Sequence, residues 1–283
     1  STSDKLFFNN NINHGYSIIY KENDFSKSQS YKLNTLTLDT SFKYKLSNYT
    51  NHTIGFGYSL KEYKVTNSST ATDNIKNSQG ESISFNLSND LSFNNLNSFL
   101  KPSRGNYVSF ANYIETPSSS SNGFIKNIIT GKKYISLGKN IFSAQAKAGN
   151  IFSLNNNEIL SDNKFSLGGK WLRGFDSFGA GPRNSRTSYV GGNNILALKL
   201  DFSKPISLNE QNPIYFNLFN DYGSLWGNKN SVTSSDKDLR ASYGFGINYY
   251  SPIGPMGFSW GFPLIDKDYD IKRMFLFSIG NIN

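Results

Sequence analysis

The feature that most constrains this chain is a strict alternation of apolar and polar residues over whole segments. Between residues 36 and 46, large apolar or aromatic side chains take most even positions, whereas polar ones take the odd positions. This period of two predicts β-strands with one apolar face and one polar face. The chain is therefore predicted to be all-β and antiparallel. The same division recurs in residues 54–61, 83–88, 142–149, 196–202, 241–249, 258–262 and 275–279.

The polar faces distinguish a membrane barrel from a soluble sandwich. They consist mainly of Gly, Ser, Asn and Thr, and the segments approach the roughly 9–11 residues with which a tilted strand crosses a bilayer. A soluble sandwich should have strands of about 5–6 residues and more Lys and Glu outside. Aromatic residues make up 15% of the 283 residues. We therefore predict an antiparallel transmembrane β-barrel with about twelve strands in this chain, and with a possible remnant of another at residues 5–11.

Several other classes of protein are excluded or disfavoured. No stretch approaches the roughly 18 consecutive apolar residues of a membrane helix. The net charge of +9 could indicate nucleic acid, but Lys and Arg are scattered instead of clustered, which favours a basic lumen and basic rims facing anionic lipid. His14 and His52 lack metal-ligand spacing, and no catalytic constellation is evident. The expectation is a protein that is not an enzyme, with no metal, no cofactor and no nucleic-acid partner.

The connections also have a pattern. Asn- and Ser-rich stretches such as residues 67–79, 117–123 and 227–237 have no period and are predicted to be loops. Residues 251–255 instead contain two prolines and a glycine, which predicts a tight turn. Long loops on one rim and tight turns on the other are typical of outer-membrane barrels.

One segment, residues 161–192, breaks the alternation. It is longer than the usual structureless connection, which indicates a functional loop. Its glycines permit tight turns and close backbone approach, and its single run of bulky residues surrounds an arginine. We expect the loop to fold inward. The Walker spacing of a phosphate loop is missing. The glycines are Gly168, Gly169, Gly181, Gly191 and Gly192, and the arginine lies in Leu172-Arg173-Gly174-Phe175.

Residues 167–175 resemble the conserved-loop motif of the BamA superfamily, the bacterial surface antigens. That motif is a Gly-Gly followed by Val/Leu-Arg-Gly-Phe/Tyr, and further motifs follow in order over residues 81–280. An ordered run of motifs is far more specific than one short pattern. The further matches are Pro102-Ser103-Arg104-Gly105, Gly181-Pro182, Gly191-Gly192-Asn193, Leu200-Asp201-Phe202, residues 221–226, residues 251–255 and residues 275–280.

The resemblance implies a larger protein. Members of the family have a sixteen-stranded barrel that follows periplasmic POTRA domains, so residues 1–283 are expected to be the C-terminal part of the barrel domain, without the POTRA domains and about the first four strands. The implied location is the bacterial outer membrane, as an integral protein. The implied partners are outer-membrane lipids, unfolded β-barrel clients and, through the N-terminal domains, lipoproteins of the assembly machinery. The end, Asn281-Ile282-Asn283, departs from the family's usual terminal aromatic residue.

The resemblance also implies a mechanism, in which the barrel folds and inserts clients through a lateral seam. A client strand would pair with the edge of the last strand, about residues 272–280, by β-augmentation. The gate residues would be Phe275, Phe277, Ile279 and Gly280. The partner edge is expected to be absent, so the strand near residues 16–21 should meet the last one imperfectly or leave the sheet open. The alternatives are a related translocation pore of the two-partner secretion or TamA type and, more distantly, a passive porin.

The family pattern finally implies a latch between the loop arginine and two aspartates. It places the partners of Arg173 at Asp201 and Asp221. The alternation independently predicts that both carboxylates point inward, because each lies on the polar face of its segment. The alternative is an exposed loop arginine with no fixed partner, worth under about 1 kcal/mol.

Overall fold

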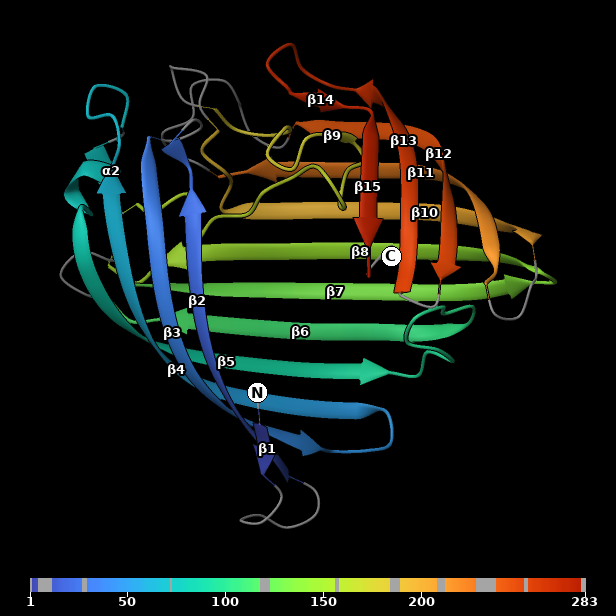
Figure 1. Ribbon diagram of the computed structural model, residues 1–283, viewed down its shortest axis with the longest axis horizontal. Helices are drawn as coiled ribbons and strands as arrows, with labels where there is room; N and C mark the ends of the chain where they lie inside the picture. Colours follow the sequence, from blue (N-terminus) through green and yellow to red (C-terminus); the bar gives the residue numbers. More distant parts are fainter. Residues whose placement is uncertain are drawn as a thin grey trace.

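A single, strongly curved antiparallel sheet dominates the computed structural model (Figure 1). The structure describes residues 2–4, 12–26, 30–71, 73–117, 123–155, 158–183, 189–207, 212–227, 238–251 and 254–280. Within those ranges, no helix is long and apolar enough to cross a membrane.

The main sheet has thirteen strands, and each pairs with its neighbour in chain order, except that β8 pairs with β10 and β13 pairs with β15. Leaving aside the three-residue β1, twelve strands remain, the number that the alternation predicts. The strands are β1 (Thr2–Asp4), β2 (Ile12–Asp24), β3 (Tyr31–Lys45), β4 (Thr50–Val65), β5 (Gly80–Asn94), β6 (Gly105–Glu115), β7 (Phe124–Leu137), β8 (Asn140–Ser153), β10 (Asn194–Ser207), β11 (Ile214–Trp226), β12 (Leu239–Ser251), β13 (Gly254–Ile265) and β15 (Phe275–Ile279).

The first and last strands of this order are β1 and β15. In the described part of the chain no ladder joins them, and β2, which includes residues 16–21, pairs with β1 and β3 instead. Among the described residues the sheet therefore ends at β1 on one side and at β15 on the other, and residues 16–21 do not pair with the last strand. The proposed strand remnant at residues 5–11 lies outside the described residues.

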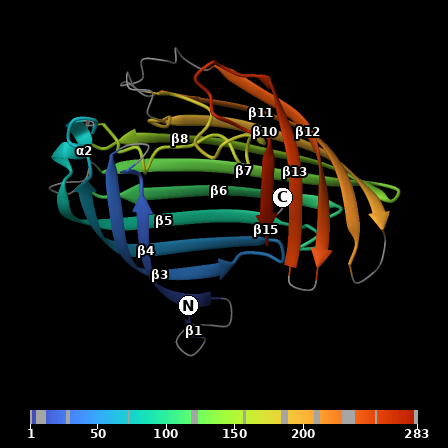
Figure 2. The same cartoon turned by 45° about the horizontal axis from the view of Figure 1, so that its top comes forward.

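The two rims of the sheet differ in the length of their connections, as predicted. Short turns such as those after β3, β7 and β12 share one rim, whereas residues 66–79 and the inner loop, which we define as residues 161–192, share the other. The expectation of an irregular stretch at residues 67–79 was wrong in one respect, because it contains the short helix α2 (Asp73–Asn77). Ile75 of this helix packs among buried aromatic residues, which stabilises the turn. Figure 2 shows α2 at this rim.

The outward face of the sheet is apolar near the seam. Phe277 on β15 lies opposite Phe258 on β13, their ring centroids are 5.1 Å apart, and the side chain of Phe277 is exposed. Trp260 and Phe275 form the next pair, at 5.3 Å. In a membrane barrel this face contacts lipid.

Replacing Phe277 by Arg should therefore impair membrane assembly, because an arginine on the lipid face costs about 2–4 kcal/mol near the midplane. Ser278→Arg is the matched control, since Ser278 follows on the same strand and points to the other face. The measurement is the folded fraction of each variant in lipid bilayers. Equal losses for the two variants would contradict this orientation of β15.

Candidate functional site

The inner loop lies inside the curve of the sheet and packs against its inner face (Figure 1). Leu167, Leu172 and Phe175 are at most 1% exposed. They belong to one apolar cluster with Ile195 of β10 and Leu225 of β11. The described parts of the loop, residues 161–183 and 189–192, therefore fold inward, as their bulky residues predicted.

Two glycines of the loop motif are required by its geometry. Gly168 has a φ of 130°, and a Cβ there would lie 1.8 Å from the carbonyl oxygen of Asp176. Gly174 has a φ of 93°, and its backbone contacts Gly261 on β13. A side chain at either position would be strained by the positive φ, and one at Gly168 would also collide with the backbone of Asp176. Gly169, Gly181 and Gly191 also have positive φ, and Gly192 lies against Leu225.

Arg173 forms the contacts that the family pattern implied. Its Nε and Nη2 donate to the two carboxylate oxygens of Asp221 at 2.7 and 2.6 Å, and its Nη1 donates to Asp201 Oδ1 at 2.7 Å. The backbone N–H of Arg173 donates to Asp221 as well, at 3.0 Å. The guanidinium is thus held bidentately by β11 and by a third bond to β10, a planar geometry that lysine cannot reproduce. We call Arg173, Asp201 and Asp221 the latch.

The latch is secluded from solvent. The side chain of Asp221 is fully buried, and those of Arg173 and Asp201 are 8% and 14% exposed. Burial by itself would lower the pKa of Arg173, but the carboxylates of Asp201 and Asp221 outweigh it and raise that pKa above its ordinary value. Arg173 is therefore a fixed cation.

Two contacts of the latch were not foreseen from the sequence. The guanidinium lies over the ring of Phe219, 3.6 Å from the centroid, a cation–π contact. Gly261 lets the loop backbone approach, since a Cβ there would lie 2.5 Å from the nitrogen of Gly174. The only signal for Gly261 was its position on the polar face of residues 258–262, where glycine leaves room.

A second segment covers the inner loop from the seam side. We call residues 266–274, between β13 and β15, the outer segment. Its strand β14 (Lys272–Arg273) pairs with β9 (Gly174–Phe175), the two residues that follow Arg173 in the inner loop. The expectation that the last strand begins at Lys272 was therefore wrong. Gly174 lies close to β13, so the backbone of β9 is in reach of residues 272–273. These residues pair with β9 as β14, and β15 begins at Phe275.

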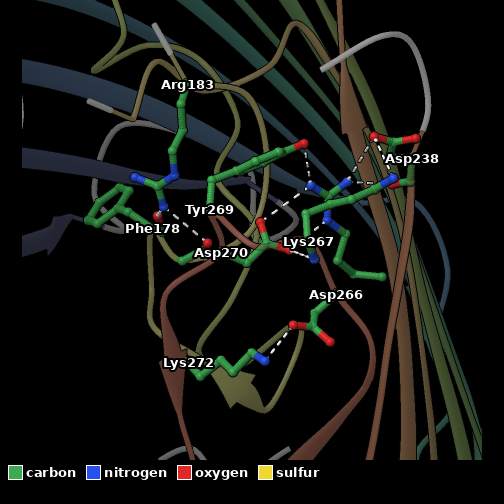
Figure 3. A network of polar contacts seen from close by, with 10 residues as sticks. Phe178, Arg183, Asp238, Asp266, Lys267, Tyr269, Asp270 and Lys272 are labelled. Carbon is green, nitrogen blue, oxygen red and sulfur yellow. Dashed lines mark hydrogen bonds and ion pairs between the residues drawn. The ribbon is translucent and has the colours of Figure 1, made fainter. Parts of the chain in front are cut away.

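The outer segment is itself fixed by a buried ion pair. Arg240 on β12 donates from Nε to Asp270 at 2.9 Å, and its Nη2 contacts the Tyr269 hydroxyl at 3.1 Å. The side chains of Arg240 and Asp270 are 1% and 0% exposed. Asp270 also accepts the backbone N–H of Lys267 at 2.9 Å, and Lys267, Tyr269 and Asp270 lie together in Figure 3. Sequence reasoning did not identify this pair, because the outer segment has no period.

The expected gate residues lie at the end of the sheet. Phe275, Phe277 and Ile279 alternate outward and are exposed, and Gly280 follows the strand, donating its backbone N–H to the carbonyl of Pro255 at 2.8 Å. In the described residues β15 has a partner, β13, on one side only. β9, which directly follows Arg173, pairs with β14 of the outer segment, and β15 begins two residues after β14. The latch, the outer segment and the last strand are thus joined by one continuous set of contacts.

Known proteins show the same architecture. The chain is 27% identical over 282 residues to the outer membrane protein assembly factor BamA of Neorickettsia risticii, covering 97% of this chain and 37% of that protein. It therefore spans little more than a third of that relative. The crystal structure of BamA from Haemophilus ducreyi lacking POTRA domains 1–3 superposes with a TM-score of 0.85 at 21% identity, covering 97% of this chain and 60% of that one.

A more distant likeness is to CdiB from Escherichia coli, with a TM-score of 0.59 at 14% identity, covering 94% of this chain and 48% of that one. The model of the Omp85 superfamily domain matches residues 1–283. The match extends over every strand of the sheet, the inner loop and the latch, and we conclude that this chain belongs to the Omp85 superfamily.

Proposed function

We propose that this chain is the barrel of an outer-membrane assembly factor, which folds and inserts β-barrel clients through a lateral seam at β15. The coarser role, insertion or translocation of proteins at the outer membrane, is supported by its BamA relatives and by its likeness to the BamA and CdiB barrels. The finer role is our inference from the seam. The implied location is the bacterial outer membrane, with the apolar outward face in lipid.

The observation that carries this proposal is the short length and the one-sided pairing of β15. It is five residues long, whereas β13 beside it has twelve. A strand that pairs on one side presents unpaired N–H and C=O groups on the other, and such an edge can template an incoming strand. Within the bilayer, leaving those groups unpaired is costly, so a client strand that pairs with them is stabilised.

The latch has a direct structural path to this edge. Arg173 fixes the inner loop on β10 and β11, the loop's β9 pairs with β14, and Met274, next in the chain, accepts the backbone N–H of Gly261 at 2.7 Å. β15 begins at the following residue. We infer that the latch sets where β15 starts and so how much of the edge is available to clients. This work needs no covalent chemistry.

The proposal predicts where a client contacts the barrel. A photo-crosslinking residue placed at Ile279, on β15, should capture an inserting client during assembly. The matched control is Phe245, an outward aromatic residue of β12, which is paired on both sides. Crosslinks should be several-fold stronger at position 279. Equal capture at both positions would contradict insertion at this seam.

A second candidate function is a translocation pore, favoured by the CdiB likeness. Measuring conductance and client insertion on the same preparation separates the candidates. Stable large pores with no insertion would favour a translocation pore or a passive porin. We expect clients to be unfolded β-barrel proteins, and we expect assembly lipoproteins to bind domains beyond this chain.

A further inference from the structure

The strongest unassigned feature is a cavity of about 460 Å³ inside the barrel, at the rim of short turns. Its wall comes from the inner faces of β7, β8 and β10, and the inner-loop residues Lys170 and Trp171 form one side. Residues 95–104, between β5 and β6, reach across the barrel mouth, because Lys101 lies 6.0 Å from the ring centroid of Tyr215 and 5.9 Å from that of Tyr250. This loop therefore covers the cavity in part, and the cavity stays partly open to solvent.

The charged residues that line this cavity are all positive. Lys132 of β7, Lys170 of the inner loop and Lys199 of β10 line it, and no Asp or Glu is among the described lining residues. Lys199 is only 5% exposed. Asp201, two residues along the strand, is engaged by Arg173 at 2.7 Å. The lysines therefore gather three positive charges without a carboxylate in the lining.

None of the three ammonium groups has an ion pair or hydrogen bond with the part of the chain that the structure describes, although the ion pairs of other buried lysines, such as Lys61 with Glu115, are present. Lys199 is buried, Lys132 is half-buried and Lys170 is exposed. Gathering like charges around one partly covered cavity is unfavourable unless an anion accompanies them. The lining also has an apolar part, which includes Phe99, Leu100 and Trp171, and Phe99 is 91% exposed. These side chains suit an anion attached to an apolar group.

We propose that this cavity binds a phosphate group, with Lys132 and Lys199 holding it from the wall and Lys170 from the inner loop. Three lysines acting as point charges suit the multiple negative oxygens of phosphate. The bound group would link the loop that carries the latch to the strands beneath it. Gly280, after the end of β15, also lines the cavity, so the occupied site would border the seam. The phosphate could belong to a lipid headgroup or be free.

The test uses the full-length protein in neutral detergent at constant ionic strength, titrated calorimetrically with inorganic phosphate and with a short-chain phosphatidylglycerol. Lys132→Gln and Lys199→Gln should each weaken binding by about tenfold or more, because each removes a charge-assisted contact. Lys133→Gln is the control, because it removes the same charge from the neighbouring, exposed position of β7. Lys132→Arg should retain binding. A lipid source predicts much tighter binding of phosphatidylglycerol, and a free source predicts similar affinities.

The melting temperature of each variant, measured with and without phosphate, tests the proposal even if a variant folds poorly. At one phosphate concentration, phosphate should raise the melting temperature of the native protein and of Lys133→Gln clearly more than that of Lys199→Gln. The proposal is overturned if phosphate and lipid show no saturable binding, or if Lys133→Gln loses as much affinity as the cavity variants. It is equally overturned if Lys199→Gln is more stable than the native protein at every phosphate concentration, since the lysines would then be merely hydrated.

Discussion

Replacing Arg173 by Ala should lower the free energy of unfolding by about 3–5 kcal/mol, because the buried carboxylates of Asp201 and Asp221 lose their cation. The same substitution should abolish most client insertion. Arg173→Lys should restore only part of the activity, since an ammonium cannot make the bidentate contact with Asp221. The measurements are urea unfolding of the protein in detergent and insertion of a model client into lipid vesicles.

A triple variant separates stability from function. Combining Arg173→Met with Asp201→Asn and Asp221→Asn removes every charge of the latch, so that no buried charge is left without a partner. We expect this variant to fold nearly as well as the native protein but to insert clients poorly. If it inserts clients at the native rate, the latch is a structural ion pair and its proposed role at the seam is wrong.

The second large effect is expected at the ion pair between Arg240 and Asp270. Asp270→Ala removes the nearer carboxylate from the guanidinium of Arg240, which is 1% exposed and keeps Asp238 at 3.9 Å, and this should cost about 3–5 kcal/mol locally. The outer segment should then leave the inner loop. Hydrogen exchange should report the loss directly, because the backbone N–H of Asp176 donates to Ile271 and that of Ile271 donates to Gly179, each at 3.0 Å.

Asp266→Ala is the matched control for that prediction. Asp266 also belongs to the outer segment and pairs with Lys272, but both side chains are partly exposed, so the loss should be under about 1 kcal/mol. Protection of the Asp176 and Ile271 amides should remain native in this variant. Similar exchange in the two variants would show that the Arg240–Asp270 pair does not hold the outer segment.

Much of the architecture could be predicted because a strand in a membrane sheet has a simple rule, with apolar residues outward and small polar ones inward. Asp201 and Asp221 follow this rule, so their inward direction could be read from the alternation. Their meeting with Arg173 could not, since a loop without a period carries no geometric signal, and it rested on the resemblance to a family.

The remaining features depend on contacts between residues that are far apart in the sequence. Arg240 shares the polar face of β12, yet its partner Asp270 lies in a segment where no rule of periodicity applies. The start of β15 was placed at Lys272 because the apolar pattern does not show that β9 competes for the same backbone. Ile75 gave no sign of its burial, because its aromatic neighbours come from β3 and β4.

The approach of the inner loop to the wall has a consequence for the order in which the chain folds. The partners of Arg173 lie 28 and 48 residues further along the chain, on β10 and β11. The contacts of Gly174 and Phe175 with β13 and the outer segment involve much later residues. Contacts that close short loops lose less chain entropy and form earlier. We expect the loop to dock as soon as β10 and β11 pair. The last strands would then assemble on a surface already in place, and their final length would be decided at the end of folding.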